Sequence, residues 1–194
     1  FVVVNCPSLP ESLAEIGAGA FFGCSGFTGD LTIPSRITEI PDNAFYSCYG
    51  FDGKLNIPKS VTSIGKSAFN YCSSLTGELK LPENLESIGS EAFSGCRGFT
   101  GKLVVPDKIT NLTVGVFSGL TGVAEITIGT GVNYIYAASD EKHALYMPGV
   151  TTVTFLGETP PVASDQWYGV FRGMPDLKTV YVPKGTYTAY RAAY

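Results

Sequence analysis

The chain has 194 residues and a formal net charge of −4, with 44% hydrophobic and only 15% charged residues. This balance excludes an intrinsically disordered chain, which combines low hydrophobicity with high net charge. The isoelectric point of about 5.0 gives no basic footprint for nucleic acid, and no apolar run approaches the ~18 residues of a transmembrane helix. The chain starts at Phe1 without a leader pattern, which favours a mature or trimmed segment of a longer protein.

A repeat of 24 residues dominates the chain between residues 9 and 127. Several kinds of residue recur with this period, among them a leucine, an isoleucine, a phenylalanine, a glycine and a cysteine. Such self-similarity is the signature of stacked repeats. The three clearest series are the phenylalanines Phe21, Phe45, Phe69, Phe93 and Phe117, the glycines Gly29, Gly53, Gly77 and Gly101, and the cysteines Cys24, Cys48, Cys72 and Cys96.

Each repeat unit predicts a short strand followed by a tight turn. In the unit that begins at Leu55, apolar and polar residues alternate over 55–57, which is the strand period, and Pro58 ends the strand. The stretch from Ala68 to Cys72 has three-residue spacing and predicts a tight helical turn. A lone unit cannot bury these positions, but stacked units can. With strands ~4.8 Å apart, about seven coils make a rod of about 30 Å.

The cysteines are expected to form a reduced, buried column. A position that recurs once per coil becomes a column along the solenoid axis, and Cys is among the most buried residue types. Leu120 occupies this position in the fifth copy, which indicates that apolarity rather than sulfur is required. A zinc site needs close Cys and His ligands, and the chain has one His. Disulfides between adjacent coils are conceivable, but they would leave Cys6 unpaired.

Beyond residue 127 the repeat loosens. The fifth copy lacks the glycine before Glu125, and residues 130–150 insert polar and aromatic residues. Strands are expected again at 153–155 and 180–182. We therefore expect a single solenoid domain over residues 1–194. Its regular repeats cover about 9–127, and its irregular repeats and C-terminal cap cover about 128–194.

The C-terminal residues predict a short capping helix. Tyr187, Tyr190 and Tyr194 are spaced i, i+3 and i+7, which places them on one helical face. An atypical terminal repeat of this kind covers an otherwise open edge. We expect the three tyrosines to close the last coil.

The repeat resembles the BspA-type, or Treponema pallidum-type, leucine-rich repeat. The segment "IPKSVTSIGKSAFNYCSSLTGELKLPENLESIGSEAFSGC" carries the resemblance, which extends over about residues 9 to 182. The copies are one residue longer than the usual 23, because of a glycine before each strand that we interpret as a small bulge. The resemblance implies a right-handed leucine-rich-repeat-like solenoid, exported to the cell surface or secreted. It implies no catalytic residues.

No motif in the sequence indicates catalysis, a metal or a cofactor. The P-loop-like Gly65–Ser67 lacks the upstream glycine, whose place Ser60 takes, and there is no nucleophile elbow or dinucleotide fingerprint. His143 stands beside two acidic residues and could suggest acid–base chemistry or a metal ligand. A polar surface loop in the irregular coil is the simpler interpretation.

Three surfaces offer candidate binding residues. Aromatic residues on the turn around each Cys are candidates because later copies place polar residues there, so the repeat does not require them. They could instead cover the turn edge or a preceding neighbour. Aromatic residues of the irregular coils are candidates because departures from a repeat often mark function, although they could instead seal the carboxyl end. The strand face has mixed charge, which is typical of a solvated sheet.

The residues of these surfaces can be named from the repeat register. On the turns they are Phe22, Tyr46, Tyr49 and Tyr71; in the irregular coils they are Tyr134, Tyr136, His143, Tyr146, Trp167 and Tyr168; on the strand face they are Asp30, Thr32, Lys54, Asn56, Glu78, Lys80, Lys102 and Thr127.

The function that these observations favour is non-catalytic binding at the bacterial cell surface. The expected partner is a host protein or a protein of a neighbouring cell, contacted through a long rigid face that needs little ordering on binding. A glycan-binding accessory module and a passive spacer that displays another domain are the alternatives. Location and adhesion follow from the family resemblance, which does not by itself fix function.

Overall fold

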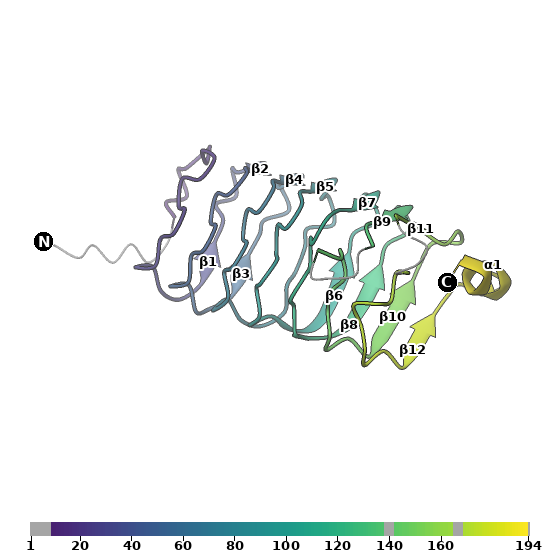
Figure 1. Ribbon diagram of the computed structural model, residues 1–194. Coiled ribbons are helices and arrows are strands. Elements are labelled where there is room, and N and C mark those ends of the chain that lie inside the picture. The colour runs from purple at the N-terminus through teal and green to yellow at the C-terminus, as the bar shows by residue number, and fades with distance from the viewer. Residues whose placement is uncertain (1–8, 138–141, 165–168, 194) are drawn as a thin grey trace, which may run out of the picture.

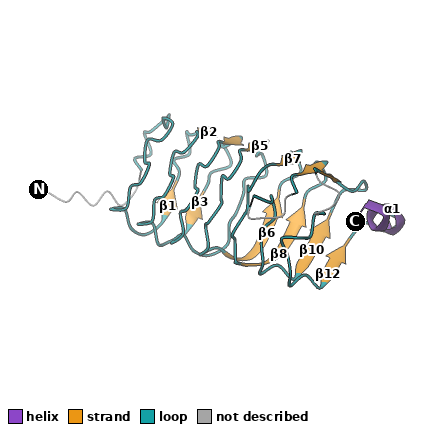
Figure 2. Cartoon of the chain, in the orientation of Figure 1, coloured by secondary structure: helices purple, strands orange, loops and turns teal. Residues whose placement is uncertain are grey.

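The computed structural model describes residues 9–137, 142–164 and 169–193. Coils of the chain stack along one axis, with the first described coil at one end and the only helix of the described ranges, α1 (Tyr187–Ala193), at the other (Figure 1). Most of each coil is loop and turn, and strands occupy two short stretches of it (Figure 2). This arrangement confirms the predicted repeat solenoid. No helix within the described ranges is both long and apolar enough to cross a membrane.

One row of parallel strands runs along the solenoid (Figure 1). Leu31 pairs with Leu55, and Ile126 pairs with both Leu103 and Val153, so equivalent repeat positions face one another. The strands are β1 (Leu31–Thr32), β3 (Leu55–Asn56), β6 (Thr100–Val105), β8 (Gly122–Ile128), β10 (Thr152–Phe155) and β12 (Thr179–Tyr181). The solenoid makes about six turns, somewhat fewer than the seven coils expected.

A second row of shorter parallel strands follows the opposite side of the coils. Ile64 pairs with both Ile40 and Ile88, and Ile135 pairs with both Leu112 and Ala163. The sequence did not predict these strands, because two residues are too few to show an alternating pattern. They are β2 (Glu39–Ile40), β4 (Ser63–Ile64), β5 (Ser87–Ile88), β7 (Asn111–Leu112), β9 (Tyr134–Ile135) and β11 (Val162–Ala163).

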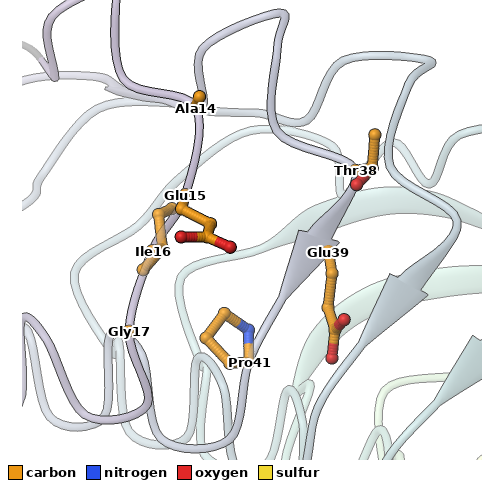
Figure 3. Close-up of a pocket in the computed structure, with 7 residues that line it drawn as sticks. All are labelled: Ala14, Glu15, Ile16, Gly17, Thr38, Glu39 and Pro41. Atoms are coloured by element: carbon orange, nitrogen blue, oxygen red, sulfur yellow. The ribbon is translucent and has the colours of Figure 1, made fainter.

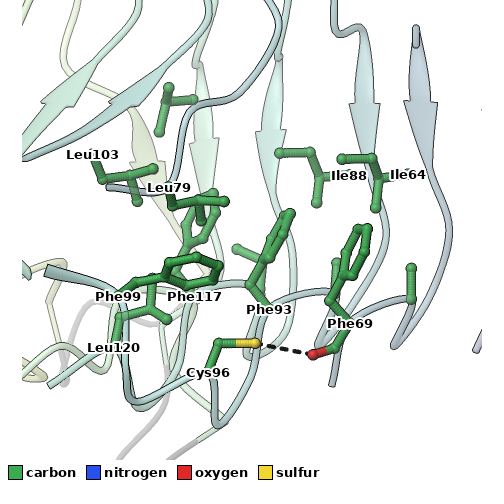
Figure 4. Close-up of a cluster of buried hydrophobic side chains, with 14 of the residues drawn as sticks. Ile64, Phe69, Leu79, Ile88, Phe93, Cys96, Phe99, Leu103, Phe117 and Leu120 are labelled. Carbon is green, nitrogen blue, oxygen red and sulfur yellow. Dashed lines mark hydrogen bonds between the residues drawn. The ribbon is translucent and has the colours of Figure 1, made fainter. Parts of the chain in front are cut away.

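Stacked phenylalanine rings fill the core between the two rows of strands (Figure 4). The ring centroids of Phe45 and Phe69 lie 5.4 Å apart with an angle of 2° between the ring planes, and those of Phe69 and Phe93 lie 5.3 Å apart. All three residues are fully buried. Pairs of this kind contribute roughly 0.5–1.5 kcal/mol beyond the burial of their area. The predicted meeting of equivalent residues in the dry interior is therefore confirmed.

The turn that leads into each cysteine is not helical. The amide of Cys48 donates to the carbonyl oxygen of Phe45 in its own coil at 3.3 Å, whereas the amide of Phe45 donates to the carbonyl oxygen of Ala68 in the next coil at 2.8 Å. Amides therefore alternate between closing the turn and linking the coils. The expected helical turn is wrong, because a helix would direct all these amides along its own axis.

This alternation depends on two positions per turn with left-handed backbone. Their φ angles are positive in each of five successive copies. Glycine adopts such angles at little cost, whereas other residues are strained there. The first position holds Gly19, Asn43, Ser67, Glu91 and Gly115, and the second holds Gly23, Ser47, Tyr71, Gly95 and Gly119.

The glycine before each strand forms the bulge expected from the longer repeat. Gly29, Gly77 and Gly101 have φ angles of 80°, 78° and 79°. The register between β6 and β8 shifts between Gly101 and Lys102, as a bulge requires. Gly53 keeps the position without a positive φ, and a side chain there would collide with Asp30.

The capping helix α1 closes the last coil through one tyrosine. Tyr190 is buried, lies 5.1 Å from Phe155 between ring centroids, and donates from its hydroxyl to the carbonyl oxygen of Gly157 at 2.7 Å. Tyr187 is 65% exposed, so the expectation that it also seals the coil is wrong. The short helix turns only one tyrosine inward, and Tyr194 lies outside the described residues.

Candidate binding surface

The cysteines form a ladder of free thiols, and each thiol serves a specific carbonyl group. Cys48, Cys72 and Cys96 are buried, and Cys24 is partly exposed. The thiol of Cys96 donates to the carbonyl oxygen of Phe69 at 2.9 Å (Figure 4). Equivalent bonds of 2.8 and 2.9 Å are made by Cys48 and Cys72. The reduced column is therefore confirmed. The thiols also donate hydrogen bonds, which the aliphatic side chain of Leu120 cannot do, so sulfur adds a contact that apolarity alone does not supply.

The buried thiols of Cys72 and Cys96 are poorly suited to redox or metal chemistry, whereas a hydrogen bond with Cys72 lowers the pKa of Cys48. Burial raises the pKa of Cys96 to about 12. The hydrogen bond with Cys48, together with burial, also raises the pKa of Cys72. Thiols of this kind stay protonated at neutral pH and are poor nucleophiles and ligands. Within the described residues there is no group of three or more His, Cys, Asp or Glu side chains that could hold a metal ion.

His143 is a buried structural residue. It has no exposed surface, and its Nδ1 accepts a hydrogen bond from the Leu145 amide while its Nε2 lies 3.0 Å from the carbonyl oxygen of Gly169. These bonds require a neutral ring that carries its proton on Nε2, and burial lowers the pKa of His143. The expectation of a polar surface loop is therefore wrong, because the imidazole fixes one irregular coil to the next.

Some polar residues of the strand face link neighbouring coils by hydrogen bonds. Asp30 accepts a hydrogen bond from the Lys54 amide of the next coil at 2.7 Å. Thr127 was expected to be exposed, but this is wrong: it is only 7% exposed and lies in β8 between Val104 of β6 and Thr154 of β10.

A groove between the first two described coils carries two carboxylates. It has a volume of about 410 Å³ and is lined by residues such as Ile16 and Pro41. Figure 3 shows Glu15 and Glu39 on the two neighbouring coils. The groove offers no aromatic face and no basic group, so it gives little basis for recognition.

Three of the four turn aromatics come together in what we call the aromatic ladder: Phe22, Tyr46 and Tyr71. Phe22 and Tyr46 are stacked, with ring centroids 4.7 Å apart and an angle of 5° between their planes. Tyr46 meets Tyr71 edge to face at 6.2 Å. Phe22 is 60% exposed and Tyr71 is 45% exposed. Tyr49 is also exposed, and its hydroxyl donates to Ser47 at 3.2 Å.

The aromatic candidates of the irregular coils are more scattered. Tyr136 is half-buried and packs against the core, which favours its structural interpretation, and Tyr134 is half-buried in β9. Tyr146 is exposed. Trp167 and Tyr168 lie outside the described residues.

A groove of about 520 Å³ continues from the aromatic ladder toward the irregular coil. We call it the turn groove. The sequence predicted three of its aromatic residues, Tyr46, Tyr71 and Tyr146, as binding candidates, but it did not single out the polar ones. Its lining comprises Tyr46, Asn70, Tyr71, Glu91, Ser94, Gly95, Arg97, Ser118, Gly119, Thr121, Lys142 and Tyr146.

Comparisons with known proteins agree with this architecture. The sequence profile described as the BspA type leucine rich repeat region, in 6 copies, matches residues 4–97 and 52–146. A comparison with curated proteins gives no match.

Two solved structures are similar in fold. One is the pneumococcal vaccine antigen PcpA, with 20% identity and a TM-score of 0.61 over 84% of this chain; the match covers 38% of the antigen. The other is the leucine-rich-repeat protein TpLRR of T. pallidum, with 23% identity and a TM-score of 0.55, over 96% of this chain and 81% of that protein.

Proposed function

The chain belongs to the BspA-type leucine-rich-repeat family, and we propose that it is a non-catalytic recognition module that binds a protein partner through the aromatic ladder and Tyr49. The family is generally non-catalytic. The partner is a protein of a host or of a neighbouring cell, and the site is the exposed edge formed by the turns.

Tyr71 is the observation that carries this proposal. It has a φ of 58°, in a position where the other copies have glycine or serine. A bulky residue in left-handed backbone is strained, and such strain is typically retained at functional sites. Because its ring is 45% exposed, burial in this chain does not account for the residue.

The surroundings of Tyr71 suit a protein interface. Tyrosine and other aromatic residues dominate the binding energy of many interfaces, because they bury a large area with few rotatable bonds. The stacked rings of Phe22 and Tyr46 sit on hydrogen-bonded turns of successive coils. Little conformational entropy is therefore lost when the partner binds.

A surface location fits the same role. The pneumococcal structure is described as a vaccine antigen, and we extend exposure at the bacterial surface, or secretion, to this chain. A long solenoid offers an extended face to partners in that setting.

The test is retention of extracellular-matrix and plasma proteins by the immobilised chain, followed by measurement of Kd for each retained protein. Tyr71→Gly and Tyr46→Ser place at each position a residue that the repeat itself uses elsewhere, at Gly95 and Ser94. We expect the double variant to weaken binding at least tenfold, about 1.4 kcal/mol, without loss of thermal stability.

Tyr187→Ser is the matched control, because Tyr187 is also an exposed tyrosine but lies on α1, at the far end from the first coils (Figure 1). It should leave Kd unchanged. Equal binding by the double variant and the unchanged chain would refute the role of the ladder. Retention of no protein at all would favour the spacer, and retention of polysaccharides alone would favour the glycan-binding module.

A further inference from the structure

The turn groove contains a buried polar atom that the fold leaves unsatisfied. Asn70 is 4% exposed, and among the described residues its side-chain oxygen Oδ1 has no hydrogen-bond partner. Burying an unpaired acceptor is unfavourable, and native structures usually avoid it. Asn70 lines the groove, but Oδ1 itself has less than 1 Å² of accessible surface, so a ligand in the groove reaches this atom when the amide group turns outward.

The repeat does not require asparagine at this position. Equivalent positions hold Phe22 and Tyr46 in earlier coils and Ser94 and Ser118 in later ones. Serine therefore fits the stack without leaving a buried amide oxygen. The change from aromatic to polar residues occurs at Asn70, where the groove overlaps the aromatic ladder through Tyr46 and Tyr71.

The tyrosine next in sequence gives the groove an aromatic wall. A side chain at position 95 would place its Cβ 2.7 Å from Cδ1 of Tyr71, so the ring of Tyr71 lies directly over Gly95. The absence of a side chain at Gly95 lets the ring lie along the groove. Tyr146 lines the same groove.

The floor of the groove cannot accept a peptide as an added strand. The amide of Gly95 already donates to Ser118 at 2.8 Å, and the amide of Gly119 donates to Tyr146 at 2.7 Å. Strand addition needs a row of free backbone groups, which these coil-to-coil bonds remove. The ligand must therefore be recognised by side chains.

Those side chains are suited to a ligand with many hydroxyl groups and one apolar face. Glu91 and Ser94 offer acceptors, Arg97 offers several donors, and the ring of Tyr71 offers a flat apolar surface with a polar tip. A volume of about 520 Å³ lies within the range of small-ligand sites, roughly 300–1,000 Å³. A sugar ring has this combination of hydroxyls and apolar face.

We infer that the turn groove binds a pyranose unit of an oligosaccharide, which stacks on Tyr71 and donates a hydroxyl hydrogen bond to Oδ1 of Asn70 after the amide group turns toward the groove. This site shares Tyr46 and Tyr71 with the ladder but goes beyond the proposed protein recognition, because its ligand class differs and its deciding residue, Asn70, is outside the ladder. Because the two sites share Tyr46 and Tyr71, a sugar and the protein partner would compete for this part of the edge.

The experiment is an array of gluco-, manno-, galacto- and N-acetylhexosamine oligosaccharides, together with sialylated and uronic-acid-containing ones, followed by titration calorimetry with the best-bound oligosaccharide. Asn70→Ser is the deciding variant, because Ser94 shows that the repeat accommodates serine. We expect it to weaken sugar binding at least tenfold while the thermal midpoint stays equal or rises. If Asn70 had only a structural role, weaker sugar binding in this variant would be accompanied by a lower thermal midpoint.

Arg97→Ser is a second variant on the exposed rim, with Ser73 as its precedent, and keeps the test valid if Asn70→Ser destabilises the fold. It should also weaken the sugar. Phe22→Ser is the control outside the groove and should leave sugar binding unchanged. Absence of binding across the array would overturn the inference, as would unchanged affinity in both groove variants. Loss of protein binding alone in Asn70→Ser would assign the groove to the protein partner instead.

Discussion

The thiol of Cys96 donates a hydrogen bond to the carbonyl oxygen of Phe69 across neighbouring coils, at a distance of 2.9 Å. The carbonyl of Phe69 also closes its own turn by accepting from the amide of Cys72. Each cysteine thus adds a second bond to a carbonyl that faces the interior. The cysteine column joins the coils by hydrogen bonds as well as by packing.

Replacement of Cys72 should separate the contribution of the donor from that of packing. Cys72→Ala removes the donor to the Phe45 carbonyl and leaves a small cavity, so we expect a loss of about 1–3 kcal/mol in the free energy of unfolding. Cys72→Ser keeps a donor and should cost less. Urea denaturation measures both values. A serine variant no more stable than the alanine variant would show that the hydrogen bond contributes nothing net.

Thiol labelling should follow burial along the column. In a Cys6→Ser background, Cys24 is partly exposed and should react first with a thiol reagent under native conditions. Cys48, Cys72 and Cys96 should react only on unfolding, since their side chains are buried and a reagent needs access to the thiol. Peptide mass spectrometry after timed labelling resolves the sites. Rapid native labelling of Cys72 would contradict the buried ladder.

Relief of left-handed strain should stabilise the protein at Glu91. Its φ is 59°, and Gly19 and Gly115 occupy the same repeat position. We expect Glu91→Gly to raise the free energy of unfolding by about 0.5–1 kcal/mol, because the left-handed penalty of about 1–2 kcal/mol exceeds the entropy gained by the unfolded chain.

The matched control for this strain is Gly95→Ala. It places a Cβ in left-handed backbone and against the ring of Tyr71, so it should lower the free energy of unfolding by at least about 1 kcal/mol. Thermal and urea denaturation should rank the proteins as Glu91→Gly, unchanged chain and Gly95→Ala. The reverse order would show that the φ angles do not limit stability.

The cap should depend on one tyrosine hydroxyl. Tyr190→Phe removes the donor to the Gly157 carbonyl, and we expect a loss of about 0.5–1.5 kcal/mol. Tyr187→Phe should have no measurable effect, because its side chain is exposed. Hydrogen exchange of the α1 amides should accelerate only in Tyr190→Phe. Equal acceleration in both variants would show that the hydroxyl of Tyr190 is not what holds the cap.

The stacking of equivalent residues could be predicted from the sequence, because a position such as Phe45 recurs in the same residue type. The left-handed positions could not, since Gly19, Asn43 and Glu91 share a backbone angle but no side-chain chemistry. The turn groove could not be predicted either. Asn70 and Lys142 are far apart in the sequence and line one groove only because several coils stack between them.

The irregular coil shows the same limit of sequence reasoning. His143 looked like a loop residue because polar residues surround it in sequence. Its burial follows from the neighbouring coil, which supplies the carbonyl of Gly169, and this contact is invisible to any periodic pattern. A buried imidazole of this kind makes stability depend on pH.

The direction of that dependence follows from the lowered pKa of His143. The unfolded chain takes up a proton near the ordinary value of 6.5, whereas the folded chain does so only at lower pH, because protonation would break the bond from the Leu145 amide to Nδ1. The unfolded state then binds more protons, so stability is complete above about pH 6.5 and is lost as pH falls toward the folded pKa. The slope is at most about 1.4 kcal/mol per pH unit.

Urea denaturation at pH 7.5 and 5.5 measures this loss, and His143→Gln gives the comparison. The glutamine variant should be less stable than the unchanged chain at pH 7.5, because Gln cannot reproduce both ring contacts. The difference between the two proteins should shrink at pH 5.5, because only the unchanged chain loses the histidine contribution. His143 is the only histidine of the chain, so carboxyl titration, common to both proteins, cancels in the comparison. An equal difference at the two pH values would mean that the imidazole keeps its ordinary pKa in the folded protein.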